Sequence, residues 1–507
     1  MKNVLPSVSH FIEHKYFSFA MVLVAFLYVT FFSISTSPLY INEGYDSVIF
    51  KSVGLAITQG KVPYVDIFDH KGPILYFINA LGQWLIPGRL GIFLLQIIAT
   101  SISFIFLFKI ARLFLNGVQS IAVMAATLFV LAGLYQAGNL CEEWILAIAS
   151  PLLYYLFEDI SSGTDKHISP LYGFFYGFSF GLAFYIRPND ALAIIGGALL
   201  GAVIYAFVVH KMSIAKLVYC VSSFIAGFIV VTIPIVFYFV YNKAFNEFIY
   251  GLFIHNSLYS GGVLGLLFAY KKIALLIIWI LLWFLIKETQ YKNILFVVIP
   301  ICAFQFLVMG ARVIPHYLID YICLFLLLGV FLIKIPSTST VLTYCALLYC
   351  VGFIGRLSLL RMSENTIIEC VELLVSHDEK CRIFYAESDK LLNIVPQVSQ
   401  DSIWNYNVTW REEYPSYSSI FFHHNITPCN KLLHYTMCYV SEKLKKEDDI
   451  KIFCPPYVVL THAHDDDTIR QPSWARFAED YSYIEANYDL LAKTDSTICD
   501  IQLYKRK

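Results

Sequence analysis

The sequence predicts an all-α membrane protein that crosses the bilayer many times and ends in a small extracytoplasmic α/β domain. The first observation behind this fold class is composition: 58% of the 507 residues are hydrophobic, 14% are charged, and the mean hydropathy is +0.64. Roughly a quarter of an ordinary globular domain is charged. The second observation is an uneven distribution of charge. Residues 1–362 hold 21 basic and 14 acidic residues, a net charge of +7, and residues 363–507 hold 15 and 23, a net charge of −8. We therefore expect a membrane domain over 1–362 and a soluble domain over 363–507.

The same composition excludes several classes of function. A soluble enzyme, a disordered protein and a collagen-like fibre are incompatible with this share of apolar residues. A formal net charge of -1 argues against a basic nucleic-acid binder. The partner that composition predicts is the lipid bilayer, and no nucleic acid is expected.

Apolar stretches long enough to cross about 30 Å of hydrocarbon recur throughout the membrane domain. The first stretch is followed by further ones and has no small-residue cleavage site, so it is expected to be a membrane helix and not a cleaved signal peptide. The sequence predicts eleven spans, which lie near 17–34, 90–110, 118–136, 143–157, 170–186, 190–209, 217–241, 272–287, 293–310, 315–334 and 338–356.

Basic residues in short loops predict the orientation, because Lys and Arg in such loops remain on the cytoplasmic side. Lys2 and Lys15 precede the first span, and Lys109 and Arg112 follow the second. These positions place the N-terminus in the cytoplasm. Since the predicted number of spans is odd, the acidic domain is expected on the extracytoplasmic side of a cell (plasma) membrane.

The first outer connection, residues 35–89, is rich in charge, with nine titratable or cationic groups. Residues 45–58 have the apolar spacing of a helix that Gly60 would end. The apolar stretch 73–86 is too short to span, so we expect a helix in the outer interface with its aromatic residues at headgroup level. The alternative is that this stretch crosses the bilayer and reverses the topology of everything after it.

Short runs of β-branched and aromatic residues in the acidic domain predict strands. The runs lie at 382–386, 418–422, 451–460 and 498–504, and a helix is expected over 431–446. Six of the 12 cysteines fall in this domain. An even number in an outward-facing domain permits disulfides, but no CxxC pair occurs, and we favour buried thiols.

Two charged side chains of the first outer loop are candidates for chemistry. Asp46 lies just beyond the first span, where a partly dehydrated carboxylate suits a general base or an electrostatic anchor. Lys71 lies beside the start of the interfacial helix, where it would meet a lipid phosphate. Asp66, Asp69 and His70 fall in the same turn, which is rich in Gly and Pro. The alternative is an ordinary polar loop, since turns contain Asp, Gly and Pro for conformational reasons alone.

The segment from Asp46 to Trp84 resembles the first outer loop of the GT-C glycosyltransferases, in the branch of the protein O-mannosyltransferases and the lipid A aminoarabinose transferases. The resemblance rests on GYDSVIFKSVGLAITQGKVPYVDIFDHKGP, which starts at residue 44, and on the helix that follows. In this sequence Ser47 follows Asp46, where members of the branch often have Glu. Weaker resemblances lie at GNLCEEW (138–144), FYIRPNDA (184–191) and GARVIPHY (310–317).

This resemblance implies a GT-C fold and transfer of a sugar from a polyprenyl-phosphate donor to a glycan, lipid or protein acceptor outside the membrane of a bacterial cell. Such an enzyme must bind the leaving phosphate with cations and take a proton from the attacking hydroxyl. Asp46 is the expected base, opposite the phosphate if the transfer inverts. The expected phosphate partners are Lys71, Arg187, Arg312 and His316, and the expected cavity residues are Tyr45, Asp66, Asp69, His70, Glu142, Glu143 and Tyr317.

Each downstream candidate also has a plain structural interpretation. Arg187 is compatible with a simple charged turn, and His316 with an anchor at the membrane interface. Glu142 and Glu143 are adjacent and point about 100° apart on a helix, so only one can face a cleft. The connection 242–271 suits either a flap over a substrate cleft or an interfacial helix.

A His- and Asp-rich stretch of the acidic domain has the composition of a metal site. We nevertheless favour a solvated loop, because nothing in the spacing supports ligation. No cofactor is assigned, and a requirement for a divalent metal is left open. The stretch contains His462, His464, Asp465, Asp466 and Asp467.

The leading hypothesis is a membrane glycosyltransferase that moves a hexosyl or pentosyl group, and two others stand beside it. A transporter or flippase of envelope precursors usually places polar residues at mid-bilayer and shows paired repeats, whereas here charge collects at one outer surface without a repeat. The third hypothesis is a non-catalytic assembly protein of the cell envelope whose tail binds saccharide. Consumption of a lipid-linked sugar by the purified protein separates the first hypothesis from the others.

Overall fold

The computed structural model describes residues 17–507 apart from residues 167 and 287 and the segments 260–269, 310–314, 335–365, 408–417, 434–440, 463–472 and 495–499. The chain forms two compact units. The helical unit comprises Met1–Ser33, Leu95–Phe237 and Ser260–Cys370, and the loop–tail unit comprises Ile34–Leu94, Tyr238–Tyr259 and Val371–Lys507. The first outer loop therefore shares a unit with the tail. The expected domain boundary near residue 362 falls outside the described residues.

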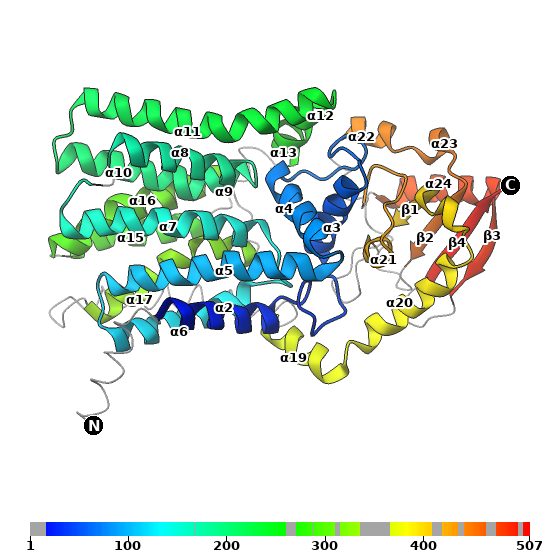
Figure 1. Ribbon diagram of the computed structural model, residues 1–507, viewed down its shortest axis with the longest axis horizontal. Coiled ribbons are helices and arrows are strands. Elements are labelled where there is room, and N and C mark those ends of the chain that lie inside the picture. Colours follow the sequence, from blue (N-terminus) through cyan, green and yellow to red (C-terminus); the bar gives the residue numbers. More distant parts are fainter. Residues whose placement is uncertain are drawn as a thin grey trace. The chain divides into compact units, whose positions relative to one another are not determined.

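The helical unit consists of apolar helices that lie side by side (Figure 1). Among the described residues, six helices are long and apolar enough to cross a membrane, which agrees with a multi-pass membrane protein. The elements in chain order are α2 (Phe17–Phe32), α5 (Arg89–Arg112), α6 (Gly117–Leu134), α7 (Cys141–Ser162), α8 (Pro170–Phe184), α9 (Pro188–Ala191), the π-helix η1 (Leu192–Gly196), α10 (Gly197–Val208), α11 (Ile214–Tyr241), α15 (Tyr270–Leu285), α16 (Thr289–Met309), the 3₁₀ helix η3 (Pro315–Tyr321) and α17 (Ile322–Lys334).

Ten of the eleven predicted spans coincide with these helices, and the eleventh, near 338–356, lies outside the described residues. Some of the ten are shorter or less apolar than a full span, as α2 with 16 residues illustrates. The helical positions are thus confirmed, whereas the number of crossings remains a prediction.

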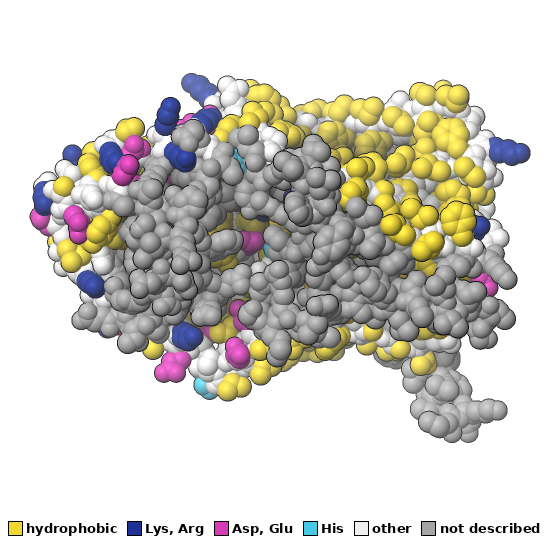
Figure 2. All heavy atoms as spheres, turned by 180° about the vertical axis from the view of Figure 1, so that it is seen from behind, with side chains coloured by type: hydrophobic (Ala, Val, Ile, Leu, Met, Phe, Trp, Pro, Cys, Tyr) yellow, Lys and Arg dark blue, Asp and Glu magenta, His cyan; other side chains and the backbone are white. Residues whose placement is uncertain are grey.

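The surface of the helical unit shows why this sequence requires a membrane. In α11 only 17% of the apolar window is buried, and Tyr219, Ile233 and Phe237 are all more than three-fifths exposed. Where Figure 2 colours the surface of this unit, hydrophobic side chains make up most of it. Because soluble proteins rarely expose apolar patches of this size, these side chains are suited to lipid.

Glycine allows two pairs of these helices to approach closely. A Cβ on Gly177 of α8 would lie 1.8 Å from the carbonyl oxygen of Phe224 in α11, and one on Gly201 of α10 would lie 2.1 Å from that of Phe296 in α16. Small residues at such contacts are the usual means by which membrane helices gain van der Waals packing.

The loop–tail unit begins with α3 (Tyr45–Thr58) and α4 (Pro73–Leu85), the two helices predicted in the first outer loop. They lie side by side (Figure 1), and a Cβ on Gly54 of α3 would lie 2.7 Å from the backbone of Asn79 in α4. Glu43, which precedes α3, meets Arg89, which follows α4. These two contacts make the helices antiparallel. With 13 residues, α4 is too short to span a bilayer.

The connection after α11 and the tail complete this unit. The tail contains a four-stranded sheet with the order β1-β2-β4-β3, in which β1 and β2 are parallel and the other neighbours are antiparallel. The elements are α12 (Phe245–Ile249), the π-helix η2 (Tyr250–Ile254), α13 (His255–Tyr259), α19 (Thr366–Ser376, which begins before this unit), α20 (Glu379–Leu392), the 3₁₀ helix η5 (Gln397–Ser402), β1 (Ile403–Asn407), α21 (Ser418–His423), α22 (Glu442–Glu447), α23 (Ile450–Phe453), β2 (Tyr457–His462), α24 (Ser473–Asn487), β3 (Tyr488–Lys493) and β4 (Asp500–Arg506).

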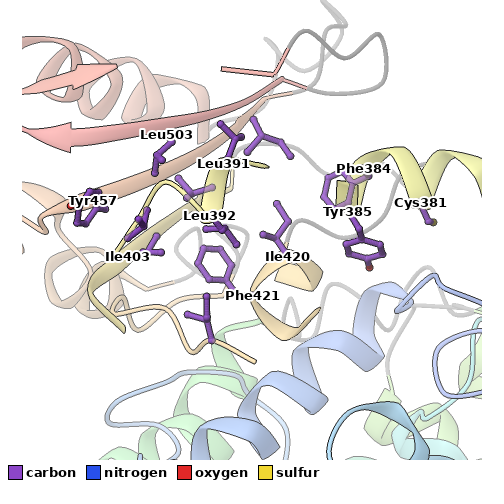
Figure 3. Close-up of a cluster of buried hydrophobic side chains, with 14 residues drawn as sticks. Cys381, Phe384, Tyr385, Leu391, Leu392, Ile403, Ile420, Phe421, Tyr457 and Leu503 are labelled. Atoms are coloured by element: carbon purple, nitrogen blue, oxygen red, sulfur yellow. The ribbon is translucent and has the colours of Figure 1, made fainter. Parts of the chain in front are cut away.

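The core of the tail forms between the sheet and two helices that the sequence wrongly predicts as strands. Residues 382–386 lie in α20 and residues 418–422 in α21. Phe384, Leu391 and Ile420 pack there against Ile403 and Leu503 of the sheet (Figure 3). The buried residues of α20 recur at helical spacing over eleven positions, so a five-residue window was too short to reveal the period.

The remaining predictions for the tail are partly correct. The run 498–504 coincides with β4, and 451–460 divides into α23 and β2. Of the helix expected over 431–446, residues 442–446 lie in α22, whereas residues 431–433 are not helical. The strands β1 and β3 were missed. Cys370 and Cys381 are buried, as expected, whereas Cys429 and Cys454 are half-buried. Cys438 and Cys499 lie outside the described residues.

Candidate active site

The predicted site residues divide between the two units. Arg312 lies outside the described residues. Asp46, Lys71, Tyr45, Asp66, Asp69 and His70 belong to the loop–tail unit, and Arg187, His316, Glu142, Glu143 and Tyr317 belong to the helical unit.

Four side chains at the start of α4 form a hydrogen-bonded group, here called the His70 cluster: Asp69, His70, Lys71 and Tyr76. Lys71 Nζ lies 2.9 Å from His70 Nε2, and His70 Nδ1 lies 3.3 Å from Asp69 Oδ1. The Tyr76 hydroxyl donates to Asp69 Oδ2 at 2.8 Å and accepts the backbone N–H of Lys71 at 2.9 Å. Three consecutive residues of one turn therefore combine a carboxylate, an imidazole and an ammonium group.

Burial and neighbouring charge determine the protonation states of this cluster. Burial, with the nearby Lys71 charge, lowers the pKa of His70 to about 3, so the imidazole is neutral at physiological pH. Burial alone would raise the pKa of Asp69, but His70, Lys71 and Tyr76 outweigh it and lower that pKa below the usual range. The charges and distances favour a His70 ring with its Nδ1 proton toward Asp69 and Nε2 accepting from Lys71.

The connection from 238 to 259 packs against the His70 cluster from the other side. Asn256 Nδ2 donates to the backbone carbonyl of His70 at 2.8 Å, and the rings of His255 and His70 are 5.7 Å apart between centroids. Tyr64, against which Gly251 packs, donates from its hydroxyl to the carbonyl of Lys71 at 2.6 Å. The helices of this connection thus contact the candidate site. Both interpretations from sequence, a flap over a substrate cleft and an interfacial helix, are compatible with such contacts.

Ion pairs hold the same connection to the tail. Lys443 of α22 donates to both carboxylate oxygens of Glu247 in α12, at 2.9 and 2.7 Å. The hydroxyls of Tyr250 and Ser441 share a short hydrogen bond. The first loop, the 238–259 connection and the tail therefore contact one another within one compact unit.

Asp46 lies in the first turn of α3 and is half-buried. No described residue forms a hydrogen bond or an ion pair with its carboxylate. Because α3 and α4 are antiparallel, Asp46 and Lys71 lie at opposite ends of the helix pair. The structure does not bring them into the one cluster that the sequence led us to expect. Tyr45 stands beside Asp46 and is also half-buried.

Asp66, an expected cavity residue, has a local role instead. Its side chain is exposed, and Oδ2 accepts the backbone N–H of Val62 at 2.7 Å. Such a bond closes the turn that leads to α4, as Asp side chains commonly do in turns.

The helical unit contains a second group of charges, here called the Arg187 cluster: Glu142, Arg187, Asp190, His316 and Asp320. Arg187 forms a short ion pair with Glu142 and one of 3.1 Å with Asp190. Its guanidinium lies 4.1 Å from the ring centroid of Tyr317, and His316 Nε2 is 4.0 Å from Glu142 Oε1. The outer turn at Arg187, the start of α7 and the start of η3 therefore meet as the resemblance implies.

Glu142 and Glu143 point in different directions, as their adjacency predicts. Glu142 joins the Arg187 cluster, whereas Glu143 accepts the backbone N–H of Leu140 at 3.0 Å and the Gln96 side-chain amide at 2.6 Å. Glu143 is thus a capping-box residue of its own helix.

No group of three or more His, Cys, Asp or Glu side chains within the described ranges has the geometry to hold a metal ion. His464 and Asp465–Asp467 lie outside those ranges, so the interpretation of that stretch is not tested. The need for a divalent metal therefore stays open.

Sequence reasoning missed Tyr76 of the His70 cluster, His255 beside that cluster, and Asp190 and Asp320 of the Arg187 cluster. Asp320 is 2% exposed, and neither carboxylate oxygen has a hydrogen-bond partner in the part of the chain that the structure describes. A carboxylate inside an apolar run is a recognisable functional signal, and it could have identified Asp320. His255 carries no such signal, because its proximity to His70 arises only in the folded chain.

Comparison with known proteins supports the fold. No protein-family model and no curated protein matches this chain in sequence. Two solved structures are similar to it: ArnT from Cupriavidus metallidurans bound to undecaprenyl phosphate, and ArnT from the same organism in the apo state. The first is 12% identical with a TM-score of 0.56 and covers 97% of this chain and 98% of its own. The second is 14% identical with a TM-score of 0.56 and covers 96% and 97%. The chain therefore has an ArnT-like GT-C fold, as the resemblance implies.

Proposed function

We propose that this protein is a membrane glycosyltransferase that takes a sugar from a polyprenyl-phosphate donor. The observation that carries this proposal is the likeness over nearly the whole chain to ArnT, a transferase solved with undecaprenyl phosphate bound. The aligned region covers 97% of this chain, so it includes the tail as well as the helices. The first-loop motif, with an acid after the first span and a Lys before the second loop helix, supports the same conclusion.

Lys71 is the proposed partner of the donor phosphate. Its ammonium group donates to the neutral imidazole of His70, which does not cancel the positive charge as a carboxylate would. Asp69 and Tyr76 fix the ring of His70, and through it the direction of the Lys71 side chain. A cation held in this way stabilises the charge that develops on phosphate as it leaves.

Asp46 is the proposed general base. In the reaction, an acceptor hydroxyl oxygen forms a bond to the anomeric carbon, and the bond from that carbon to the phosphate oxygen breaks with its electron pair remaining on phosphate. The hydroxyl proton passes to Asp46. An inverting transfer requires the base and the leaving phosphate on opposite faces of one sugar. Because Asp46 and Lys71 lie at opposite ends of the α3–α4 pair, the two roles are proposed and tested independently.

The side of the membrane and the acceptor belong to the proposal as well. The basic residues around the first two spans support an N-terminus in the cytoplasm, and the first outer loop would then face the extracytoplasmic side. The acceptor is then a glycan, lipid or protein of the cell envelope.

Donor consumption by the purified protein tests this function. The protein in lipid nanodiscs is incubated with a panel of polyprenyl-phosphate hexoses and pentoses, and release of polyprenyl phosphate is measured. We expect one donor to be consumed, and Asp46→Asn to reduce the rate by about 10²–10⁴-fold, the usual contribution of a general base. Asp489→Asn, an exposed carboxylate of β3, serves as the control. Consumption by Asp46→Asn at the wild-type rate would falsify the assignment of the base.

A further inference from the structure

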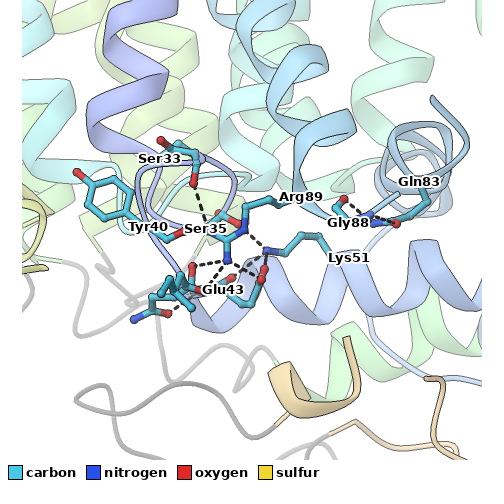
Figure 4. A network of polar contacts seen from close by, with 12 residues as sticks. Ser33, Ser35, Tyr40, Glu43, Lys51, Gln83, Gly88 and Arg89 are labelled. Atoms are coloured by element: carbon cyan, nitrogen blue, oxygen red, sulfur yellow. Dashed lines mark hydrogen bonds and ion pairs between the residues drawn. The ribbon is translucent and has the colours of Figure 1, made fainter. Parts of the chain in front are cut away.

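A network of buried charges holds the chain segment that leads into α3 (Figure 4). The guanidinium of Arg89 donates to the backbone carbonyls of Ser37, Ile41 and neighbouring residues, and to Glu43 Oε1 at 2.6 Å. Lys51, which is fully buried, donates to the carbonyl of Ser35 at 2.6 Å and forms a short ion pair with Glu43. Two cations, Arg89 and Lys51, thus bind carbonyl groups of this segment.

The tail holds the same segment by its amide groups. Asp378 Oδ2 accepts the backbone N–H of Ile41 at 2.5 Å and that of Asn42 at 3.2 Å. Phe422 of the tail lies 5.0 Å from Lys51 Nζ, measured to the ring centroid. Hydrogen bonds therefore hold backbone carbonyls and backbone amides within residues 35–43. The group that binds the amides, the Asp378 carboxylate, belongs to the C-terminal domain.

The first turn of α3 depends on this anchoring because its own cap is weak. The N-cap residue is Gly44, with φ +66°, and it supplies no side-chain hydrogen bond to the helix. Asp46 lies in that uncapped turn, directly after the anchored segment. The backbone that carries Asp46 thus follows directly on a segment that is held by residues far along the chain.

We infer that Glu43, Lys51, Arg89 and Asp378 are positioning residues that orient Asp46 for catalysis, and that the C-terminal domain contributes to the reaction through Asp378. This inference rests on the proposed function, in which Asp46 is the base. Stability alone is a weak reason for such a network, because buried ion pairs are often no more stabilising than well-packed apolar residues of similar size. A misplacement of about 1 Å in a catalytic group costs up to about 10²-fold in rate. A network that holds the first turn of α3 in place would avoid this loss.

The network also predicts a pH dependence that a passive scaffold would not have. Burial lowers the pKa of Lys51 to about 8, even with Glu43 beside it. The charged groups that face Lys51 are Glu43 and Arg89, and Tyr385 and Asp378 of the tail lie close to the same network. As pH rises past about 8, Lys51 loses its charge and with it the ion pair to Glu43. The interactions that hold residues 35–43 in place then become weaker.

The test compares kcat and donor KM in wild type, Lys51→Met, Lys51→Arg and Glu43→Gln, with Lys61→Met as the matched control. Lys61 also donates to a carbonyl, that of Pro428 at 3.2 Å, but follows the other end of α3. At pH 7 we expect Lys51→Met and Glu43→Gln to lower kcat about tenfold or more and to change donor KM less than about twofold. We expect Lys51→Arg to retain activity and to move the alkaline decline to higher pH, and Lys61→Met to resemble wild type.

Distinct results separate this inference from the proposed function. If Asp46→Asn abolishes donor consumption while folded Lys51→Met and Glu43→Gln keep wild-type kcat, the positioning role is refuted and the function stands. If Asp46→Asn is fully active, the assignment of Asp46 as the base fails, and the positioning role fails with it. If the wild-type protein consumes no donor of the panel, the function itself fails. Should Lys51→Met not fold, Asp378→Asn provides the same test, since it must lower kcat and speed hydrogen exchange at amides 45–48. Unchanged kcat and exchange in that variant also refute the inference.

Discussion

The His70 cluster and the Arg187 cluster both contain a cation beside carboxylates, but the cation has different partners. Lys71 donates to a neutral imidazole, whereas Arg187 is shared by Glu142 and Asp190, with His316 and Asp320 nearby. An ammonium group beside a neutral acceptor can still bind an anion. A guanidinium already paired with two buried carboxylates must give up one of them to do so. From this comparison we expect a phosphate to bind at Lys71, and we expect Arg187 to contribute mainly to the stability of the helical unit.

The largest expected effect that tests this comparison is on stability. Arg187→Met leaves Glu142 and Asp190 as buried carboxylates without their guanidinium, and we expect the free energy of unfolding to fall by about 3–5 kcal/mol. Thermal unfolding in detergent measures the loss. Arg112→Met is the control, because Arg112 donates to a nearby loop carbonyl, that of Leu115. A stable Arg187→Met protein that no longer binds undecaprenyl phosphate would reverse the roles of the two clusters.

The next effect is on ligand binding. Lys71→Met removes one charge-assisted hydrogen bond, which is worth about 1.5–3 kcal/mol, so binding of undecaprenyl phosphate should weaken by about 10- to 150-fold. The melting temperature should change little. Titration of the protein in nanodiscs, with Lys61→Met in parallel, measures the affinity. Equal affinities for wild type and Lys71→Met would remove Lys71 from the phosphate site.

A smaller effect concerns the neutral state of His70. In the unfolded chain a histidine binds a proton near pH 6.5, whereas burial lowers the pKa of His70 in the folded protein to about 3. The unfolded state therefore binds more protons between these values, and stability decreases as pH falls below about 6.5, by up to about 1.4 kcal/mol per pH unit. Unfolding of wild type and His70→Gln at several pH values between about 4.5 and 6.5 measures the difference. Identical slopes for the two proteins would mean that His70 is not buried in its neutral form.

The smallest effect separates the two adjacent glutamates. Glu143 caps its own helix, so Glu143→Gln should cost about 1 kcal/mol or less of stability and leave undecaprenyl phosphate binding within about twofold. Glu142→Gln should cost more, because Glu142 pairs with Arg187. Melting temperatures of the two variants, measured side by side, give the comparison. If Glu143→Gln is the more damaging change, the assignment of Glu143 as a cap is wrong.

Some features of the fold followed from sequence because they depend on local pattern. Long apolar runs in the first 362 residues form helices in lipid wherever the structure describes them, since an unpaired backbone cannot remain in hydrocarbon. The helices at 45–58 and 73–86 also appear within a residue or so of their predicted ends. In the tail, by contrast, the runs at 382–386 and 418–422 have the composition of strands and fold as helices. Contacts with the sheet outweigh local propensity there.

The residues of the candidate site also divide into those that local sequence identifies and those that only the fold brings together. Asp69, His70 and Lys71 could be named from sequence, because they are neighbours in one turn. Only the tertiary structure could add His255 and Asn256 to that turn, or show that Glu142 and not Glu143 meets Arg187. It also separated Asp46 from Lys71, because the antiparallel packing of α3 and α4 sends the two residues to opposite ends.

The amino-acid sequence by itself determined that this chain is a membrane protein. It also determined the positions of most helices and the turn that carries the charged residues. These properties depend on hydropathy and on spacing along the chain. Tertiary structure decided which charges meet. A pairing between Arg89 and Glu43, or between Asp378 and the amide of Ile41, joins residues far apart in sequence. Such pairs arise from the way whole helices pack, which no local pattern encodes.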